Sequence, residues 1–282
     1  TEELCGRSFS KSTVSALCAA LDPVVIAFRD RQLERRYPFV MADALYTKVR
    51  ENGRIRSKGF MIAVGINEQG FREILGFSCA DSETEAGWTA FFRELKGRGL
   101  AQVDMVISDS HKGLVQAVKQ CFQGATWQRC QTHFSRNMLD VCPKKLHPEM
   151  KAALKSLYEA GDYETAILLR DSMLSRFQQE APKAAALLEE SFEDVMAVLS
   201  LPYTLRRRLR TTNGIERLNE EIRRRERVIR IFPNEESLSR LIGALLMEIN
   251  DGWQSGKVYL DLTAYLAQQL QADKPASKKS VA

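Results

Sequence analysis

Three strand-like segments follow one another early in the chain, and they constrain the fold more than any other feature. Tyr37–Arg50 is rich in residues that favour strands, and the pair Asn52-Gly53 behind it marks a tight hairpin turn. Gly59–Asn67 is a continuous apolar run, and a short polar turn leads from it into Phe71–Ala80. The economical interpretation is three consecutive antiparallel strands.

Helical and strand-like patterns alternate after these segments. Ser82–Gly97 has its large apolar residues at helical spacing, and Val103–Ser108 reads as a short buried strand that ends directly before Asp109. Another helix follows, and Ala125–Phe134 is interpreted as a fifth strand or a junction between strand and helix. The alternation predicts an α/β fold, with a mixed five-stranded sheet and flanking helices.

The second half of the chain is mainly helical. Asn137–Leu205 has apolar residues at helical spacings and no candidate catalytic group, so its expected role is to separate two parts of one site. Asn213 is the predicted N-cap of the next helix. Pro233 and Asn234 begin another helix, whose unbroken apolar stripe must pack on the sheet.

The two ends of the chain are predicted to be accessory. Ser8–Arg31 has the spacing of a short helix, which we interpret as the remnant of an N-terminal DNA-binding region, with a plain amphipathic linker as the alternative. The chain opens at Thr1 without a methionine, which indicates a fragment or a processed chain. The segment from Gln271 onward has the composition of a disordered tail.

Composition narrows the cellular setting. A chain of 282 residues with 44% hydrophobic residues can bury a substantial core, and its length fits one or two domains. No apolar run reaches the length of a membrane span, and nothing near the start resembles a signal peptide. The six cysteines lack the density and spacing of a disulfide scaffold, which fits a reducing compartment. We therefore expect a cytoplasmic protein with no membrane partner.

Positive charge is concentrated in Arg206–Arg230. This stretch holds ten arginines against four glutamates, a local excess of six positive charges, whereas the whole chain carries a net charge of only +5. Guanidinium groups suit the phosphates of nucleic acids. The alternative is a solvated helix face whose charges pair with one another.

Three carboxylates are candidate metal ligands. Asp43 stands in an otherwise apolar strand, where a carboxylate is costly unless a cation or a hydrogen-bond donor meets it. Asp109 follows the end of a strand, and Glu216 lies close to a helix start. For the last two, a helix-capping role is the alternative interpretation.

Cys130 and His133 have the spacing of half a zinc site. No second pair of ligands stands at a matching spacing elsewhere in the sequence. We therefore interpret them as a pair that supports the core or a functional site, and not as a structural zinc site.

The order of these elements is that of an RNase H-like fold interrupted by an all-helical insertion. The chain also resembles the mutator-type transposases of bacterial insertion sequences, relatives of the plant Mutator elements, from about Leu4 to Trp253. Five segments carry the resemblance in matching order: YPFVMADALYTKVR, VISDSHKGL, WQRCQTHF, RTTNGIERLNEEIRRR and IFPNEESLSRLIGALL. One departure is Gly214, where the family often has alanine or proline.

The resemblance implies a DDE-type transposase, an enzyme that cleaves a DNA strand and transfers the freed 3′-OH. It carries the catalytic Asp-Asp-Glu triad onto Asp43, Asp109 and Glu216. Two Mg²⁺ ions, with Mn²⁺ as a substitute, are the expected cofactors. The implied partners are the terminal inverted repeats of the element, the target DNA and further copies of the chain, as a dimer or a larger synaptic assembly.

The remaining assignments complete this hypothesis. The expected site-supporting residues are Cys130, His133 and Asn213. The expected DNA-binding residues are Arg210, Arg217, Arg223, Arg224, Arg225 and Lys112. The predicted divisions are residues 1–36 for the DNA-binding remnant, 37–135 and 206–255 for the two parts of the catalytic domain, 136–205 for the insertion, and 256–282 for a C-terminal helix and flexible tail.

Two rival functions share these sequence features. One is a transposase-derived DNA-binding or regulatory protein without strand-transfer activity, which would tolerate loss of an acidic residue. The other is a nuclease that hydrolyses nucleic acid and joins nothing.

Overall fold

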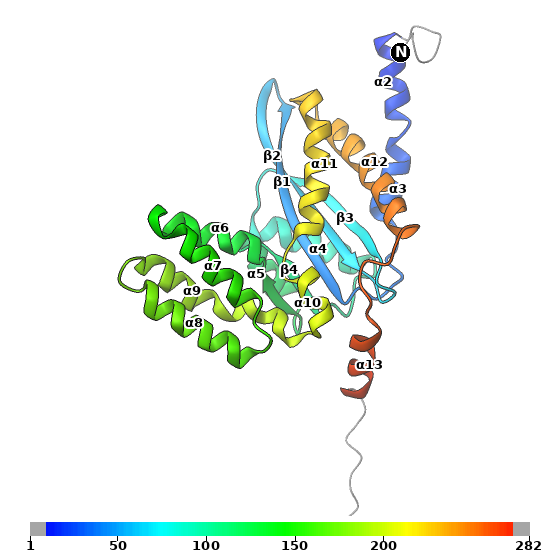
Figure 1. Cartoon of the computed structure of the whole chain (residues 1–282). Coiled ribbons are helices and arrows are strands. Elements are labelled where there is room, and N and C mark those ends of the chain that lie inside the picture. Colours follow the sequence, from blue (N-terminus) through cyan, green and yellow to red (C-terminus); the bar gives the residue numbers. More distant parts are fainter. Residues whose placement is uncertain (1–9, 273–282) are drawn as a thin grey trace, which may run out of the picture.

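The computed structural model describes residues 10–272, in which five strands form one mixed sheet (Figure 1). The strand order is β3-β2-β1-β4-β5. β1 and β3 are antiparallel to β2, whereas β4 is parallel to β1 and to β5. The predicted α/β class and five-stranded mixed sheet are therefore confirmed. The bounds are β1 (Phe39–Glu51), β2 (Arg54–Ile66), β3 (Arg72–Ala80), β4 (Met105–Ser108) and β5 (Thr126–Arg129).

A long hairpin of β1 and β2 is the centre of the sheet. The two strands pair without a break from Phe39 opposite Ile66 to Glu51 opposite Arg54. Asn52 at the hairpin tip has a φ of 49°, a left-handed value that asparagine tolerates better than most residues. β4 pairs with β1 only over its first three residues, so β1 continues beyond the end of β4.

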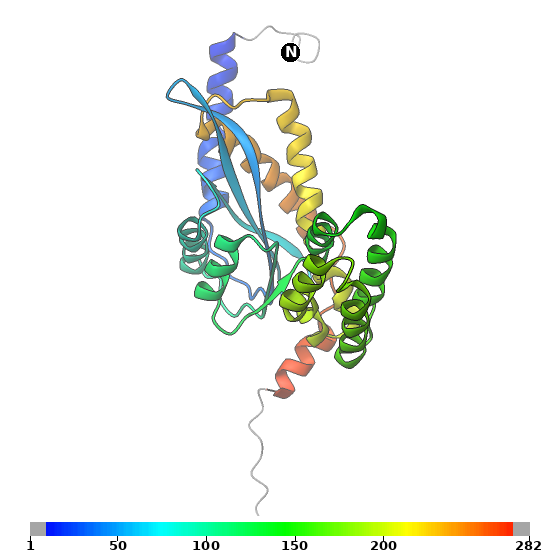
Figure 2. The ribbon, with the colours of Figure 1, turned by 90° about the vertical axis from the view of Figure 1, so that its left-hand side faces the viewer.

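Helices cover both faces of the sheet (Figure 2). α4 (Glu85–Gly97) and α5 (Lys112–Cys121) pack on the face to which Val40 and Ala42 of β1 belong. α11 (Asn213–Ile229) and α12 (Glu235–Gln254) pack on the opposite face, with Phe39 and Met41. This alternation follows from the two-residue period of a strand, and it assigns odd-numbered positions of β1 to the α11 face.

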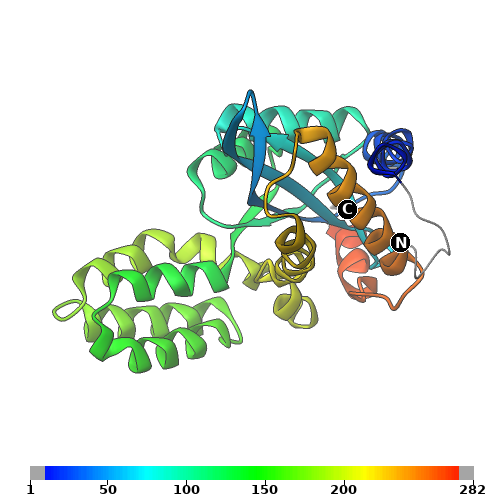
Figure 3. The same cartoon turned by 90° about the horizontal axis from the view of Figure 1, so that it is seen from above.

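A helical bundle with its own core stands beside the sheet (Figure 3). Every regular element between the end of β5 and the start of α11 is a helix, and this run is longer than the predicted residues 136–205. Whether this bundle is an insertion into the sheet domain stays a prediction. Its elements are α6 (Gln131–Val141), the short η1 (Lys144–Leu146), α7 (His147–Tyr158), α8 (Tyr163–Phe177), α9 (Pro182–Met196), η2 (Ala197–Ser200) and α10 (Tyr203–Leu209).

The N-terminal part contains two helices, so the prediction of one short helix was wrong. Two residues separate α2 (Lys11–Ala19) from α3 (Asp22–Asp30), which has a proline in its first turn, a position that proline favours. α2 buries no side chain, whereas α3 packs Val25 into the core and pairs Asp22 with Arg240 of α12.

The stretch Lys11–Asp30 is long and apolar enough, by length and composition, to cross a membrane. Among residues 10–272 it is the one helical stretch that meets this test, and the prediction that no apolar run reaches this length did not include it. Such a stretch is weak evidence for a membrane segment.

The C-terminal part ends in α13 (Thr263–Ala272), where a C-terminal helix was expected. The predicted disordered tail, apart from Gln271 and Ala272, lies outside the described residues, as do residues 1–9 of the predicted DNA-binding remnant.

Candidate active site

Asp43 lies in β1 and Asp109 directly follows the neighbouring parallel strand β4, at the same level. Met41 of β1 pairs with Ile107 of β4, and each aspartate follows its paired residue by two positions. Neighbouring strands are about 4.8 Å apart, so the backbones at the two aspartates are neighbours, and the charge of Asp109 acts on Asp43. The early end of β4 leaves Asp109 at the carboxyl edge of the strand, while Asp43 remains inside β1 on the α11 face.

The carboxylate of Asp43 is held from two sides. Its Oδ1 accepts a hydrogen bond from the backbone N–H of Ala44 at 2.9 Å, and its Oδ2 accepts one from the Nδ2 of Asn219 at 2.8 Å. Burial and the neighbouring charge of Asp109 raise the pKa of Asp43 to about 7. The site therefore concentrates negative charge that its hydrogen bonds do not offset.

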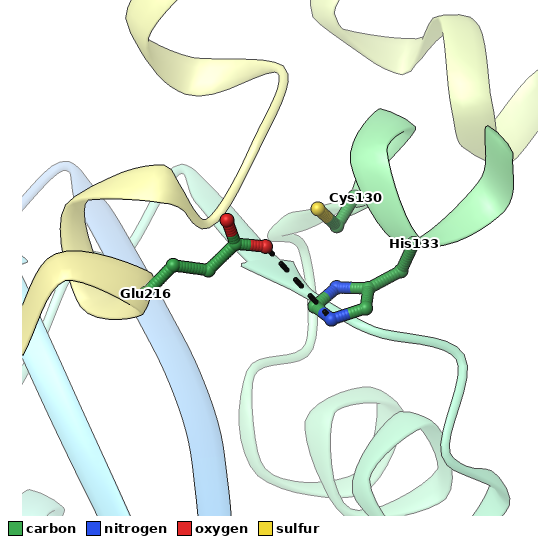
Figure 4. Close-up of side chains that lie close together, drawn as sticks. All are labelled: Cys130, His133 and Glu216. Carbon is green, nitrogen blue, oxygen red and sulfur yellow. Dashed lines mark ion pairs between the residues drawn. The ribbon is translucent and has the colours of Figure 1, made fainter. Parts of the chain in front are cut away.

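Glu216 reaches the same place from the opposite side, on α11. It lines a cavity of about 610 Å³ together with Asp43, His133 and Asn219. Its Oε1 lies 3.9 Å from Nε2 of His133, as the dashed line in Figure 4 shows. Within residues 10–272 this buried oxygen has no hydrogen-bond partner, an arrangement that is costly without a ligand.

The predicted cap of α11 was wrong by one residue. Thr212 is the N-cap, because its carbonyl oxygen accepts the N–H groups of Ile215 and Glu216, and the helix begins at Asn213. Glu216 is therefore the fourth helical residue and does not complete a capping box. The side chain of Thr212 does not cap the helix, since its hydroxyl group donates to Cys130 at 3.3 Å.

Cys130 joins the start of α6 to the start of α11. Its Sγ accepts a hydrogen bond from the backbone N–H of Thr212 at 3.4 Å as well as the bond from the hydroxyl group. The thiol is fully buried, and its Sγ, a ring nitrogen of His133 and an oxygen of Glu216 lie within 4.8 Å of one another (Figure 4). The pair predicted to support the site thus lies against Glu216.

The imidazole of His133 faces a negative environment. Its contact with Cys130 and the charges of Asp43 and Asp109 raise the pKa of His133 to about 8, against the opposing effect of burial. Burial opposes ionisation of Cys130, but its contacts with His133 and Thr212 together outweigh burial and lower the pKa of the thiol. A positive imidazolium can therefore persist near neutral pH beside the carboxylates.

The far end of α11 is fixed to β1. After the helix, Phe232 forms a parallel bridge with Val49, and its backbone N–H and carbonyl groups bond to Lys48 and Arg50 at 2.8 Å each. This segment occupies the part of β1 that β4 leaves unpaired. With Cys130 and Thr212 at one end and Phe232 at the other, α11 has a defined position over Asp43.

The residues predicted to bind DNA differ in whether they already form ion pairs or hydrogen bonds within the protein. Lys112 and Arg217 are exposed, and neither forms an ion pair within the described part of the chain. Arg210 donates to the carbonyl oxygen of Tyr158 at 2.9 Å. The remaining three are engaged by neighbours: Arg223 with Glu226 and the carbonyl of Tyr46, and Arg224 and Arg225 with Glu221.

Asn213 lies apart from the carboxylates. It lines a second cavity beside Arg217, and its Oδ1 accepts a hydrogen bond from the hydroxyl group of Thr132 at 3.3 Å. It therefore helps to join α6 to α11 but does not line the cavity of Asp43 and Glu216.

Two residues near the carboxylates escaped the sequence analysis. Asn219 lies one helical turn after Glu216, so the i, i+3 spacing could have placed both on one face. Glu83, in the loop before α4, has its pKa raised by burial and by Asp109, and lies 3.9 Å from His111. Nothing in the local sequence marks Glu83, because its neighbours come from distant segments.

Known proteins match this chain over most of its length. The family model described as "Transposase, Mutator family" matches residues 1–256. The transposase of insertion sequence IS256 in transposon Tn4001 from Staphylococcus aureus is 45% identical over 92% of this chain and 67% of its own length. The transposase of IS1081 from Mycobacterium tuberculosis is 40% identical over 99% of this chain and 68% of its own length.

A solved structure gives a much weaker likeness. The catalytic core domain of HTLV-2 integrase, in a trimeric form with magnesium, matches 47% of this chain and 92% of its own length at 14% identity. The TM-score of 0.24 is too low to assign a shared fold.

The sequence match to the transposases is much stronger than this structural likeness, because it spans the sheet, the helical bundle and α11 together. The chain covers about two thirds of the length of these relatives. The resemblance seen in the sequence is thereby confirmed, and the chain belongs to the Mutator family of transposases.

Proposed function

We propose that this chain is the catalytic part of a DDE-type transposase, which binds element-end DNA, cleaves a strand and transfers the 3′-OH. The observation that carries the proposal is the meeting of Asp43 and Glu216 at one cavity, with the charge of Asp109 acting on Asp43. Three acidic groups from a strand, a strand end and a helix match the donor set that phosphoryl-transfer chemistry needs.

The sheet topology supports an RNase H-like fold for this domain. Three antiparallel strands, followed by two strands parallel to the first, give the order β3-β2-β1-β4-β5 with helices on both faces. In this proposal the helical bundle between β5 and α11 is the insertion that separates the second aspartate from the glutamate in sequence.

The residues present fit a pair of hard divalent cations. Asp43 and Asp109 repel each other, and the buried Oε1 of Glu216 has no hydrogen-bond partner among residues 10–272. Carboxylate oxygens are the donors that Mg²⁺ prefers. Asp43, Asp109 and Glu216 would hold two Mg²⁺ ions, for which Mn²⁺ can substitute. When bound, such ions activate an oxygen nucleophile and stabilise charge on the phosphate.

The other side chains of the cavity orient these carboxylates and offset charge. Asn219 donates a hydrogen bond to one oxygen of Asp43 and so holds this carboxylate in a defined orientation. His133 supplies positive charge within 3.9 Å of Glu216. Arg136 and Arg227 also line the cavity, where they can bind a DNA phosphate that approaches the carboxylates.

The partners follow from the same proposal. They are the terminal inverted repeats of the element, the target DNA and further copies of the chain in a dimer or larger synaptic assembly, in the cytoplasm. The residues that would hold the DNA backbone are Lys112, Arg210, Arg217, Arg223, Arg224 and Arg225.

The decisive experiment measures Mg²⁺-dependent cleavage and joining of DNA that carries the element ends. We expect Asp109→Asn to reduce both to background, because it removes one carboxylate charge from the site. Asp140→Asn is the matched control, since Asp140 is exposed on α6, and it should retain activity. Equal cleavage and joining by Asp109→Asn and wild type would refute the catalytic assignment, whereas no cleavage by the wild type would favour a regulatory protein. Cleavage without joined products would favour a nuclease.

A further inference from the structure

A second cavity, of about 480 Å³, opens beside the first turn of α11. It is separate from the cavity of Asp43 and Glu216, and four elements from three distant parts of the chain build it. These are the start of β3, the end of α10, the start of α11 and the loop before α13. The lining includes Arg72, Arg207, Arg208, Gly214, Arg217 and Tyr259.

The four arginines of this cavity have no acidic partner. Within the described part of the chain, none of them lies within 4.0 Å of a carboxylate oxygen, and no Asp or Glu lines the cavity. By contrast, Arg224 and Arg225, further along α11, both pair with Glu221. Four guanidinium groups that converge without a counter-charge create a local positive potential that attracts anions.

Aromatic rings hold part of this arginine group in place. The guanidinium carbon of Arg72 lies 4.1 Å from the ring centroid of Trp253 and 4.4 Å from that of Tyr259. Arg208 lies over the same Tyr259 ring at 5.1 Å. Because these stacked arginine side chains are already ordered, binding an anion costs less side-chain entropy.

The start of α11 adds to the positive potential. Because the hydroxyl group of Thr212 donates to Cys130, no side chain caps the first turn of this 17-residue helix. Asn213 and Gly214 of that turn line the cavity. The positive end of the helix dipole therefore lies beside the four arginines.

The positive charges of the arginines in this cavity repel one another. Burial, and to a smaller extent the charges of Arg208 and Arg217, lower the pKa of Arg72. A bound anion would offset this repulsion.

We propose that this cavity binds a backbone phosphate of the DNA strand that enters the candidate active site. The inference rests on the proposed function and adds Arg72, Arg207 and Arg208 to the DNA-binding surface. Asn213 at this cavity and Glu216 at the other lie three residues apart, which is about 4.5 Å along the axis of α11. A strand that reaches the carboxylates can therefore place a neighbouring phosphate among the arginines.

The test compares the salt dependence of DNA binding in two double variants. The pocket variant is Arg207→Gln/Arg208→Gln, at two exposed positions. The control is Lys145→Gln/Arg176→Gln, which removes the same charge from two exposed residues that pair with Glu180 in the helical bundle. The probe is a fluorescent duplex of about 30 base pairs, measured by anisotropy between about 50 and 200 mM salt.

We expect the pocket variant to reduce the slope of log K against log salt by about 1, the effect of one lost phosphate contact. The control should keep the wild-type slope. Arg207→Lys/Arg208→Lys preserves both charges and should restore the slope. A wild-type slope in the pocket variant, or an equal reduction in pocket and control variants, would overturn the inference.

Cleavage assays on the same proteins separate this inference from the proposed function. If wild type cleaves element-end DNA while the pocket variant keeps the wild-type slope, the phosphate site is wrong and the catalytic proposal stands. If Asp109→Asn cleaves as wild type does, the catalytic proposal falls, whereas the slopes still decide whether the arginine cavity binds a phosphate.

Discussion

The Sγ of Cys130 accepts two hydrogen bonds from Thr212, one from its backbone N–H at 3.4 Å and one from its hydroxyl group at 3.3 Å. The two residues are 82 positions apart. Through this contact the first turn of α6, which carries His133, and the first turn of α11, which carries Glu216, keep a fixed relative position. Cys130 is therefore a positioning residue for the candidate metal ligand.

Loss of this contact should lower the affinity of the site for divalent metal ions. We expect Cys130→Ala to raise the Mg²⁺ concentration for half-maximal cleavage by about 10-fold to 100-fold, the range found for residues that orient metal ligands. Cys130→Ser should recover part of the loss, because a hydroxyl group still accepts from Thr212. Cys121→Ala, at another buried cysteine, is the control. An unchanged Mg²⁺ requirement in Cys130→Ala would show that Cys130 only fills space.

Asn219 should control the protonation of Asp43. Asn219→Asp replaces the amide that donates to Asp43 with a carboxylate, and the added negative charge raises the pKa of Asp43 further. The pH at which cleavage reaches half of its maximum should therefore rise by about one unit or more. Asn234→Asp provides a matched control, since Asn234 caps α12 and aspartate caps equally well. A pH profile that coincides with wild type would contradict this role.

Stability should depend jointly on pH and on Mg²⁺. The pKa of Asp43 is raised from 3.8 to about 7, so the folded protein retains a proton that the unfolded chain releases. The free energy of unfolding should therefore fall as pH rises through this range. Because Mg²⁺ binds the ionised carboxylate, its stabilising effect should be larger at about pH 8 than at about pH 6.

Thermal unfolding with and without Mg²⁺ at both pH values measures this effect. Asp43→Asn should remove most of the difference, since the amide does not titrate. A stabilisation by Mg²⁺ that is equal at the two pH values would argue against a metal site at Asp43.

Close packing of α12 should limit substitution at Gly243. A Cβ atom at this position would lie 2.4 Å from Cγ1 of Val25 and 2.9 Å from Cζ of Phe77. We expect Gly243→Ala to lower the free energy of unfolding by about 1–3 kcal/mol through overpacking. Gly252→Ala, in the same helix with nothing within 4 Å of its Cβ, should instead be neutral or stabilising by up to about 1 kcal/mol. Urea unfolding distinguishes the two outcomes.

Local chemistry explains which parts of the fold were predictable. The β1–β2 hairpin follows from Asn52-Gly53 and the apolar runs on either side, all within one short stretch. The start of α12 near Pro233 and Asn234 was also predicted, and it depends on a local contact, since the Asn234 side chain accepts from the N–H of Ser237. The cap of α11 was misplaced, since the partner of the Thr212 hydroxyl group is a thiol 82 residues away.

The same distinction applies to the candidate site. Asp43, Asp109 and Glu216 could be named because a family resemblance preserves their order along the chain. The contact between Asn219 and Asp43 could not, because 176 residues separate them. The arginine cavity also depends on long-range packing, since Arg72 of β3 meets Arg208 of α10 only across the tyrosine ring of Tyr259.

The hydrogen bond between Asn219 and Asp43 also bears on biosynthesis. A polypeptide still under translation can pair β1 with β2, yet Asn219 leaves the ribosome only after the whole helical bundle. A product that terminates prematurely within the bundle would carry both aspartates and lack Glu216. The proposed metal site would thus become complete only late in synthesis, when α11 is added. Incomplete chains would therefore be unable to cleave the DNA of the genome that encodes them.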